Sequence, residues 1–107
     1  PLHLDMLKGS VTPADIEALL AARYAGSDYV RVVPAEAGGK IEPQALNGTN
    51  GLEIRVYGDA ALGQAVLVAR FDNLGKGASG AAVQNLGLML GIPVNADLPM
   101  ARPHAAE

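Results

Sequence analysis

Alternating apolar and polar residues predict two adjacent strands in the middle of the chain. In LEIRVYG, Leu52, Ile54 and Val56 alternate with polar residues, which is the period-two pattern of a strand with one buried face. QAVLVARFD follows after the turn GDAALG, so the two segments predict an antiparallel hairpin. The second strand has apolar residues on both faces. We therefore expect it to lie centrally in a sheet and to be covered on both sides.

The segment SVTPADIEALLAARYAG predicts a helix. Thr12 is the expected N-cap, Pro13 fits the first turn, and Asp15 has the spacing of a capping box. Gly26 is the expected stop. The apolar stripe expected to face the core consists of Ile16, Leu19, Leu20 and Tyr24.

Two further strands and a long loop are predicted in the first half of the chain. Leu2, Leu4 and Met6 alternate with polar residues, and DYVRVVP predicts a short strand ending at Pro34. No lead-in residues stand before the first of these strands, so we expect further sequence to precede Pro1 in a parent protein. The loop that follows, residues 35–51, is long and rich in Gly, Pro and Asn, as functional or mobile loops are.

A second helix is predicted after the glycine-rich stretch GKGASG, with Val83, Leu86 and Leu90 on one side and Gly91 and Pro93 at its end. Residues 93–107 show no periodicity and are interpreted as a tail. The order strand, helix, strand, strand, strand, helix predicts an α+β fold in which helices pack on a mostly antiparallel sheet. Residues 1–92 are expected to form this one domain.

Composition narrows the possible functions. The chain has 107 residues, is 50% hydrophobic and 18% charged, and carries a net charge of −3, which is typical of one globular domain. Its eight basic residues are scattered, so no stripe of charge is available to bind nucleic acid. No apolar segment reaches the roughly 20 residues of a membrane span, and no signal peptide is recognisable. We expect a cytoplasmic protein.

The types of residue that are missing also restrict the chemistry. The chain has no cysteine, which excludes disulfides, thiolate metal sites and a cysteine nucleophile within it. Its two histidines, His3 and His104, lie at opposite ends of the sequence. We therefore expect neither a metal site nor a histidine-based catalytic triad.

GKGASG, residues 75–80, spells the G-x-G-x-x-G pattern of a dinucleotide-binding turn. Such a turn requires a second parallel strand after its helix, and the residues after Gly91 do not predict one. Alternatively, the glycines allow a sharp turn and close packing of the helix through Gly80 and its neighbours. Polar residues nevertheless gather here. Asp72, Asn73 and Lys76 at a helix N-terminus suit an anion or a carboxamide.

The stretch FDNLGKGASGAAVQNLGLMLG resembles the C-terminal signature of the N-acetyl-gamma-glutamyl-phosphate reductases. ALNGTN resembles a Gly-Thr/Ser-Asn motif of the same family, and PLHLDML resembles its shorter, second type. The resemblance extends over residues 1–92. It implies a parent enzyme with an N-terminal Rossmann domain for NADP and a catalytic and dimerisation domain like that of glyceraldehyde-3-phosphate dehydrogenase, of which this chain is the C-terminal part.

The resemblance also implies a reaction. The family reduces the acyl phosphate N-acetylglutamyl phosphate to a semialdehyde in arginine biosynthesis, using a cysteine thiolate, a histidine acid–base and hydride from NADPH. This chain contains neither the cysteine motif nor the histidine motif, so no catalytic residue is assigned to it. By itself it is expected to be inactive. Its expected partners are the missing N-terminal half, the substrate and a second copy of the enzyme.

By the same resemblance, Asn73 corresponds to an asparagine that bonds the nicotinamide carboxamide in related dehydrogenases. Gly75, Lys76 and Gly77 are expected to line the same corner of the cofactor pocket. A simpler interpretation is that Asp72 and Asn73 only cap the turn. Two other functions remain open: a free-standing α+β interaction or small-ligand module that binds through residues 35–51, and a minimal nucleotide binder that uses GKGASG.

Overall fold

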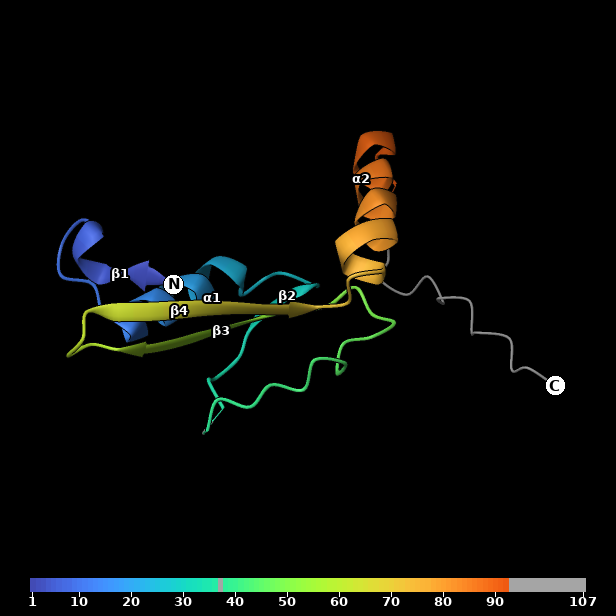
Figure 1. Cartoon of the computed structure of the whole chain (residues 1–107). Helices are drawn as coiled ribbons and strands as arrows, with labels where there is room; N and C mark the ends of the chain where they lie inside the picture. Colours follow the sequence, from blue (N-terminus) through green and yellow to red (C-terminus); the bar gives the residue numbers. More distant parts are fainter. Residues whose placement is uncertain (37, 93–107) are drawn as a thin grey trace.

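The computed structural model describes residues 1–36 and 38–92, which form a four-stranded sheet and two α-helices (Figure 1). The elements in chain order are β1 (Leu2–His3), the 3-10 helix η1 (Leu4–Met6), α1 (Pro13–Tyr24), β2 (Val30–Val32), β3 (Leu52–Asp59), β4 (Gln64–Phe71), the π-helix η2 (Gly75–Ser79) and α2 (Gly80–Leu90). The predicted tail, residues 93–107, lies outside the described residues.

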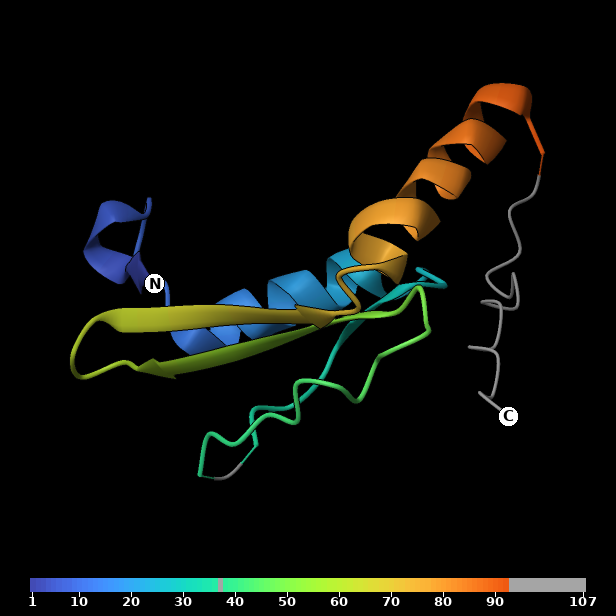
Figure 2. The same cartoon turned by 45° about the vertical axis from the view of Figure 1, so that its right-hand side comes forward.

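The sheet has the strand order β1-β4-β3-β2. β4 pairs antiparallel with both β1 and β3, whereas β2 runs parallel to β3. The α+β fold with a mostly antiparallel sheet is therefore confirmed, with one parallel edge. Parallel neighbours need a crossover of about a dozen residues or more. The long segment between β2 and β3 supplies that crossover along one side of the sheet (Figure 2).

Helix α1 begins where its capping residues predict. Thr12 Oγ1 accepts from the Asp15 amide at 3.2 Å, and Asp15 Oδ2 accepts from the Thr12 amide at 2.9 Å. The hydrogen bonds from Thr12 hold the pKa of Asp15 below its ordinary value. Pro13, the first helical residue, rests on Gly58 of β3, where a Cβ atom would lie 2.5 Å from Pro13 Cγ. Gly58 therefore lets the start of the helix approach the hairpin closely.

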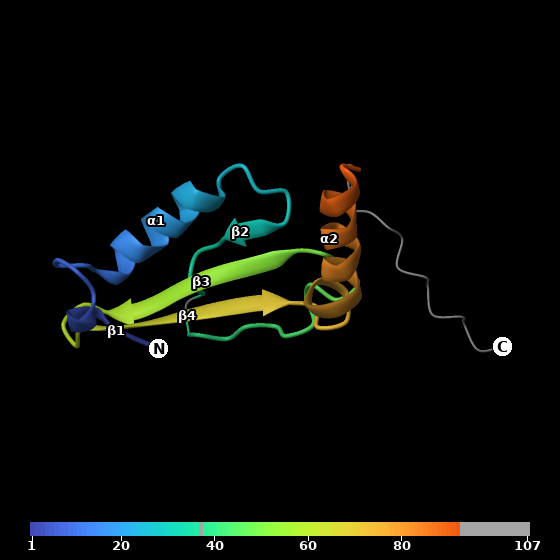
Figure 3. The same ribbon diagram turned by 90° about the horizontal axis from the view of Figure 1, so that it is seen from above.

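A small core lies between α1 and the sheet. Its buried residues come from η1, α1, β3 and β4, and partly buried side chains of Leu2, Val11 and Leu20 pack against them. The buried members are Leu4, Ile16, Val56 and Ala65. Viewed from above, α1 lies toward the β2 side of the sheet and away from β4 (Figure 3). The core is therefore confined to one part of the sheet face.

This limited coverage contradicts several expectations. The side chains of Val66, Leu67 and Phe71 on β4 are 42%, 38% and 40% exposed, so the prediction that this strand is covered on both faces is wrong for the described chain. Leu19, predicted for the buried stripe of α1, is 71% exposed because the helix meets the sheet through Ile16 and Leu20. The first predicted strand is also too long, since residues 4–6 turn into η1.

Helix α2 stands away from the sheet (Figure 1). It ends at Gly91 with a left-handed φ of 65°, as predicted. Gly87 is its buried residue, and its large apolar side chains are exposed. Only α1 therefore meets the expectation of a helix packed on the sheet. Among the described residues, no helix is long and apolar enough to cross a membrane.

A charged network lies on the sheet face opposite the core. Glu53 Oε2 accepts from Arg55 Nη1 at 2.9 Å and from Arg70 Nε at 3.1 Å. Arg55 also pairs with Glu36 at 3.1 Å, and Arg70 Nη1 donates to the Glu42 carbonyl at 2.8 Å. The two arginines thereby fasten the segment between β2 and β3 to the sheet.

Candidate functional site

The two motifs singled out in the sequence meet in space. Asp72, at the end of β4, is 9% exposed, and its Oδ2 accepts from the amide of Gly48 in ALNGTN at 2.8 Å. Its Oδ1 accepts from the amide of Leu74 at 3.0 Å. The amide of Gly75 donates to the same carboxylate. One side chain therefore joins the Gly-Thr-Asn loop to the glycine-rich turn.

The electrostatics of Asp72 follow from these bonds. The amide of Gly48 contributes most, followed by that of Leu74, and together with Gly75 they outweigh burial and hold the pKa of Asp72 below its ordinary value. Backbone N–H groups favour the charged form of a carboxylate that accepts from them. Asp72 is thus an ionised hydrogen-bond acceptor engaged with the backbone.

Close packing explains the glycine spacing of GKGASG. A Cβ atom on Gly80 would lie 1.9 Å from Asn50 Oδ1, and one on Gly75 would lie 2.9 Å from the Thr49 carbonyl oxygen. A Cβ on Gly77 would lie 3.0 Å from the ring of Phe71. None of the three has a positive φ. The glycines are therefore explained by the approach of residues 48–50 and of Phe71, in agreement with the close-packing alternative.

Gly80→Ala is expected to destabilise the chain by about 1–3 kcal/mol, the usual cost of forcing extra atoms into a packed site. The new methyl group must displace Asn50 and also meets the Gly75 carbonyl oxygen at 2.8 Å. Urea unfolding followed by circular dichroism measures the change. Gly26→Ala is the matched control, because a Cβ at Gly26 has no neighbour within 4 Å. Equal stability of the two variants would contradict this account of the turn.

Backbone amides of the turn are bonded within the turn itself. The Gly77 amide donates to the Asp72 carbonyl at 2.9 Å, and the Ser79 amide donates to the Leu74 carbonyl at 3.2 Å. The Gly75 amide is engaged by the Asp72 carboxylate. The amides of Gly75 and Gly77 are therefore engaged within the turn.

Asn73 and Lys76 lie in the same turn but in different surroundings. Asn73 is exposed, and no hydrogen bond to its side chain is present among the described residues. Lys76 is half-buried, donates to Gln84 Oε1 at 2.7 Å, and lies over the ring of Tyr29 at 5.2 Å from the centroid. An ammonium has three N–H donors. The bond to Gln84 uses one of these donors, so a bound anion would lie next to the Gln84 side chain.

Sequence reasoning missed two contributions to this site. The sequence indicates Asp72 as part of a polar site or as a cap of its own turn, but nothing in the local pattern links it to Gly48, 24 residues earlier. Tyr29, which follows α1, gave no signal that it would meet Lys76. The available signal was that ALNGTN and FDNLGKG each resemble a motif of the same family.

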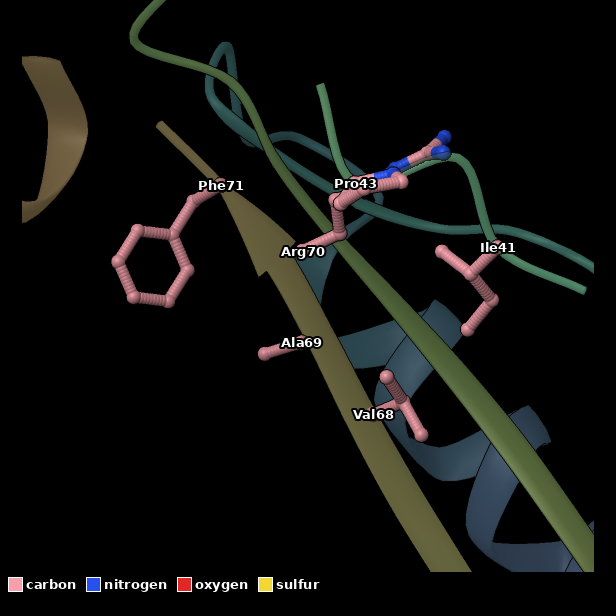
Figure 4. Close-up of a pocket in the computed structure, with 6 residues that line it drawn as sticks. All are labelled: Ile41, Pro43, Val68, Ala69, Arg70 and Phe71. Carbon is pink, nitrogen blue, oxygen red and sulfur yellow. The ribbon is translucent and has the colours of Figure 1, made fainter. Parts of the chain in front are cut away.

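A shallow pocket lies between the 35–51 segment and β4 (Figure 4). Ala69 and Phe71 point to one side of the strand, whereas Arg70 and Val68 point toward Ile41 and Pro43 on the other. The Arg70 guanidinium is already bonded to Glu53 and to the Glu42 carbonyl. The pocket is therefore largely apolar. Within the described residues, no three His, Cys, Asp or Glu side chains are grouped to hold a metal.

Comparison of the sequence with known proteins identifies one family. Residues 2–73 match the family described as semialdehyde dehydrogenase, dimerisation domain. The chain is 49% identical to N-acetyl-gamma-glutamyl-phosphate reductase 2 of Pseudomonas putida and 53% identical to N-acetyl-gamma-glutamyl-phosphate reductase of Burkholderia cenocepacia. It is 50% identical to the protein of that name from Brucella ovis. Each match covers 85% of this chain and 30% of the relative, so the chain spans less than a third of their length.

Proposed function

The chain belongs to the semialdehyde dehydrogenase dimerisation-domain family, and on that premise we propose that it is the C-terminal part of an NADP-dependent N-acetyl-gamma-glutamyl-phosphate reductase. The observation that carries the proposal is the similarity to reductases of that name at 49–53% identity over 85% of the chain. The whole enzyme would reduce N-acetylglutamyl phosphate to the semialdehyde in arginine biosynthesis, in the cytoplasm.

The glycine-rich turn is the proposed contribution of this chain to the cofactor pocket. Asn73 is exposed at the end of β4, and its amide can both donate to and accept from a nicotinamide carboxamide. Lys76 keeps N–H groups for a phosphate beside Gln84. Gly75 and Gly77 pack against Thr49 and Phe71, so their proposed role in this corner of the pocket is to shape the backbone that carries Asn73 and Lys76. NADPH, when bound, supplies the hydride.

Exposed apolar surfaces support the proposal that this chain works within a larger assembly. Helix α2 carries Leu88 and Met89 at 80% and 83% exposure, and Leu86, Leu90 and Ile92 are also exposed. Apolar patches of this kind are rare on isolated soluble domains and indicate contact sites. We propose that the N-terminal part of the enzyme covers α2. The family description supports a second copy as the other partner, making the enzyme a homo-oligomer.

The division of labour between this chain and the rest of the enzyme is testable. We expect the 107-residue chain to show no reduction of N-acetylglutamyl phosphate by NADPH, because it contains no thiol to form a covalent acyl intermediate. The full-length gene product should catalyse the reaction, measured by loss of NADPH absorbance. Turnover by the purified chain, or an inactive full-length protein, would refute the proposal. N-acetylglutamate without the phosphate is the substrate control.

A further inference from the structure

The bond between Asp72 and the Gly-Thr-Asn loop has a consequence for catalysis. We propose that Asp72 is a positioning residue, which fixes the backbone beside Asn73 by tying it to residues 48–50. The inference rests on the proposed function, because it assumes that Asn73 contacts the cofactor. It adds a residue that touches neither substrate nor cofactor and acts through its neighbour.

The geometry singles out Asp72 for this role. Asn73 has no side-chain hydrogen bond among the described residues, so its direction is set by the backbone on either side. That backbone is held by Asp72, whose carboxylate accepts from the amides of Leu74 and Gly75 and whose carbonyl accepts from Gly77. These are local bonds. They fix the shape of the turn but not its place relative to the rest of the domain.

The bond from the Gly48 amide to Asp72 fixes the place of the turn relative to the rest of the domain. Asp72 Oδ2 accepts from the Gly48 amide at 2.8 Å, across 24 residues of sequence. Asn50 then packs against Gly80 at the start of α2, and the Thr49 carbonyl lies against Gly75. The Gly-Thr-Asn segment is held by its own hydrogen bonds. Thr49 Oγ1 donates to the Leu46 carbonyl at 2.8 Å and accepts from the Gly51 amide at 3.2 Å. The turn is thus held against a preformed loop.

Asp72→Asn in the full-length reductase tests the inference. Gly48 and Leu74 donate to different carboxylate oxygens, and in Asn an NH2 donor replaces one of these oxygens and faces one of the two amides. Misplacing a reacting group by about 1 Å can cost about a hundredfold in rate. We expect kcat/KM for NADPH to fall about ten- to hundredfold. Asp72→Ser is a second variant: its hydroxyl can still cap the adjacent amides but is too short to reach Gly48, and the same loss is expected.

A double-mutant cycle with Asn73→Ala separates positioning from mere stabilisation. If Asp72 acts through Asn73, the Asp72→Asn change should cost less than about threefold in kcat/KM once Asn73 is absent, because coupled effects are not additive. Additive losses would overturn the inference and leave the proposed function intact. If Asn73→Ala alone leaves kcat/KM unchanged, the proposed role of Asn73 fails, and this inference fails with it.

Asp59 provides the matched control. Its Oδ1 accepts from the amides of Ala61 and Leu62 at 2.8 and 3.4 Å, so it also caps a turn, but at the opposite end of the β3–β4 hairpin. Asp59→Ala, which removes the accepting oxygen, should lower the melting temperature with less than about a twofold change in kcat/KM. A loss of catalysis equal to that of Asp72→Asn would show that any weakened turn slows the enzyme, and would overturn the inference.

Discussion

Glu53→Ala is expected to destabilise the chain by about 3–5 kcal/mol, the range observed when one partner of a buried ion pair is removed. Its carboxylate accepts from Arg55 and Arg70, whose side chains are only 6% and 11% exposed. Without Glu53, Arg70 loses its ion-pair partner and Arg55 keeps only Glu36, counting ion pairs within residues 1–36 and 38–92. Urea unfolding of the 107-residue chain measures the loss. Because small domains are stable by only about 5–15 kcal/mol, this loss is a large fraction of the total and should lower the urea midpoint strongly.

Glu36→Ala is the control for this prediction. Glu36 also pairs with Arg55, at 3.1 Å, but its side chain is 48% exposed. Exposed ion pairs contribute about 0–1 kcal/mol, because water screens the charges. The two substitutions therefore remove the same charge from the same partner in different surroundings. Similar stabilities of Glu36→Ala and Glu53→Ala would contradict the assignment of Glu53 as the anchor of the network.

The pH dependence of stability gives the same test without mutation of the arginines. Burial disfavours ionisation of Glu53, but hydrogen bonds from Arg70 and Arg55 outweigh it, so its pKa lies below the ordinary value. A lowered pKa in the folded state means that Glu53 contributes stability above the unfolded-state pKa of about 4.3. That contribution is lost as the pH falls through the folded-state pKa. Glu53→Ala should therefore flatten the acid side of the stability profile relative to the unmodified chain.

Local signals in the sequence predicted the elements well. Thr12 and Asp15 form the expected capping box, and the alternation around GDAALG gives the observed hairpin. These features depend on residues close together in the chain, where hydrogen-bond geometry follows from spacing. The exposure of Leu19, Phe71 and other apolar residues could not be predicted in the same way. Apolar periodicity identifies a face that needs a partner, and it does not say whether this chain supplies that partner.

The candidate site shows the same limit. The sequence located the turn and its unusual polar residues, but the contacts of Asp72 with Gly48 and of Gly80 with Asn50 join segments that are distant in the chain. The G-x-G-x-x-G pattern marks positions where another group must come close to the backbone. That group can be a loop of the same protein or a bound dinucleotide. Only the three-dimensional arrangement distinguishes these uses. Here Thr49 and Asn50 fill the space into which a Cβ on Gly75 or Gly80 would project.

Asn73→Ala in the full-length reductase is expected to lower kcat/KM for NADPH about five- to 150-fold. The figure follows from the loss of one hydrogen bond whose partner is left unpaired in a closed pocket, about 1–3 kcal/mol, at about 1.4 kcal/mol per tenfold. Because the Asn73 side chain has no hydrogen bond among the described residues, its removal should leave the melting temperature nearly unchanged. Steady-state kinetics and thermal unfolding of the same preparation measure both quantities.

The control for Asn73→Ala is Asn47→Ala, which removes an exposed amide from the neighbouring loop. It should change neither kinetics nor melting temperature appreciably, since surface substitutions usually have effects within about 0.5 kcal/mol. The interpretation in which Asn73 only caps the turn predicts the opposite pattern for Asn73→Ala, with a lower melting temperature and unaltered kinetics. That result would remove the turn from the cofactor pocket, because a group that orients the nicotinamide must affect hydride transfer more than it affects folding.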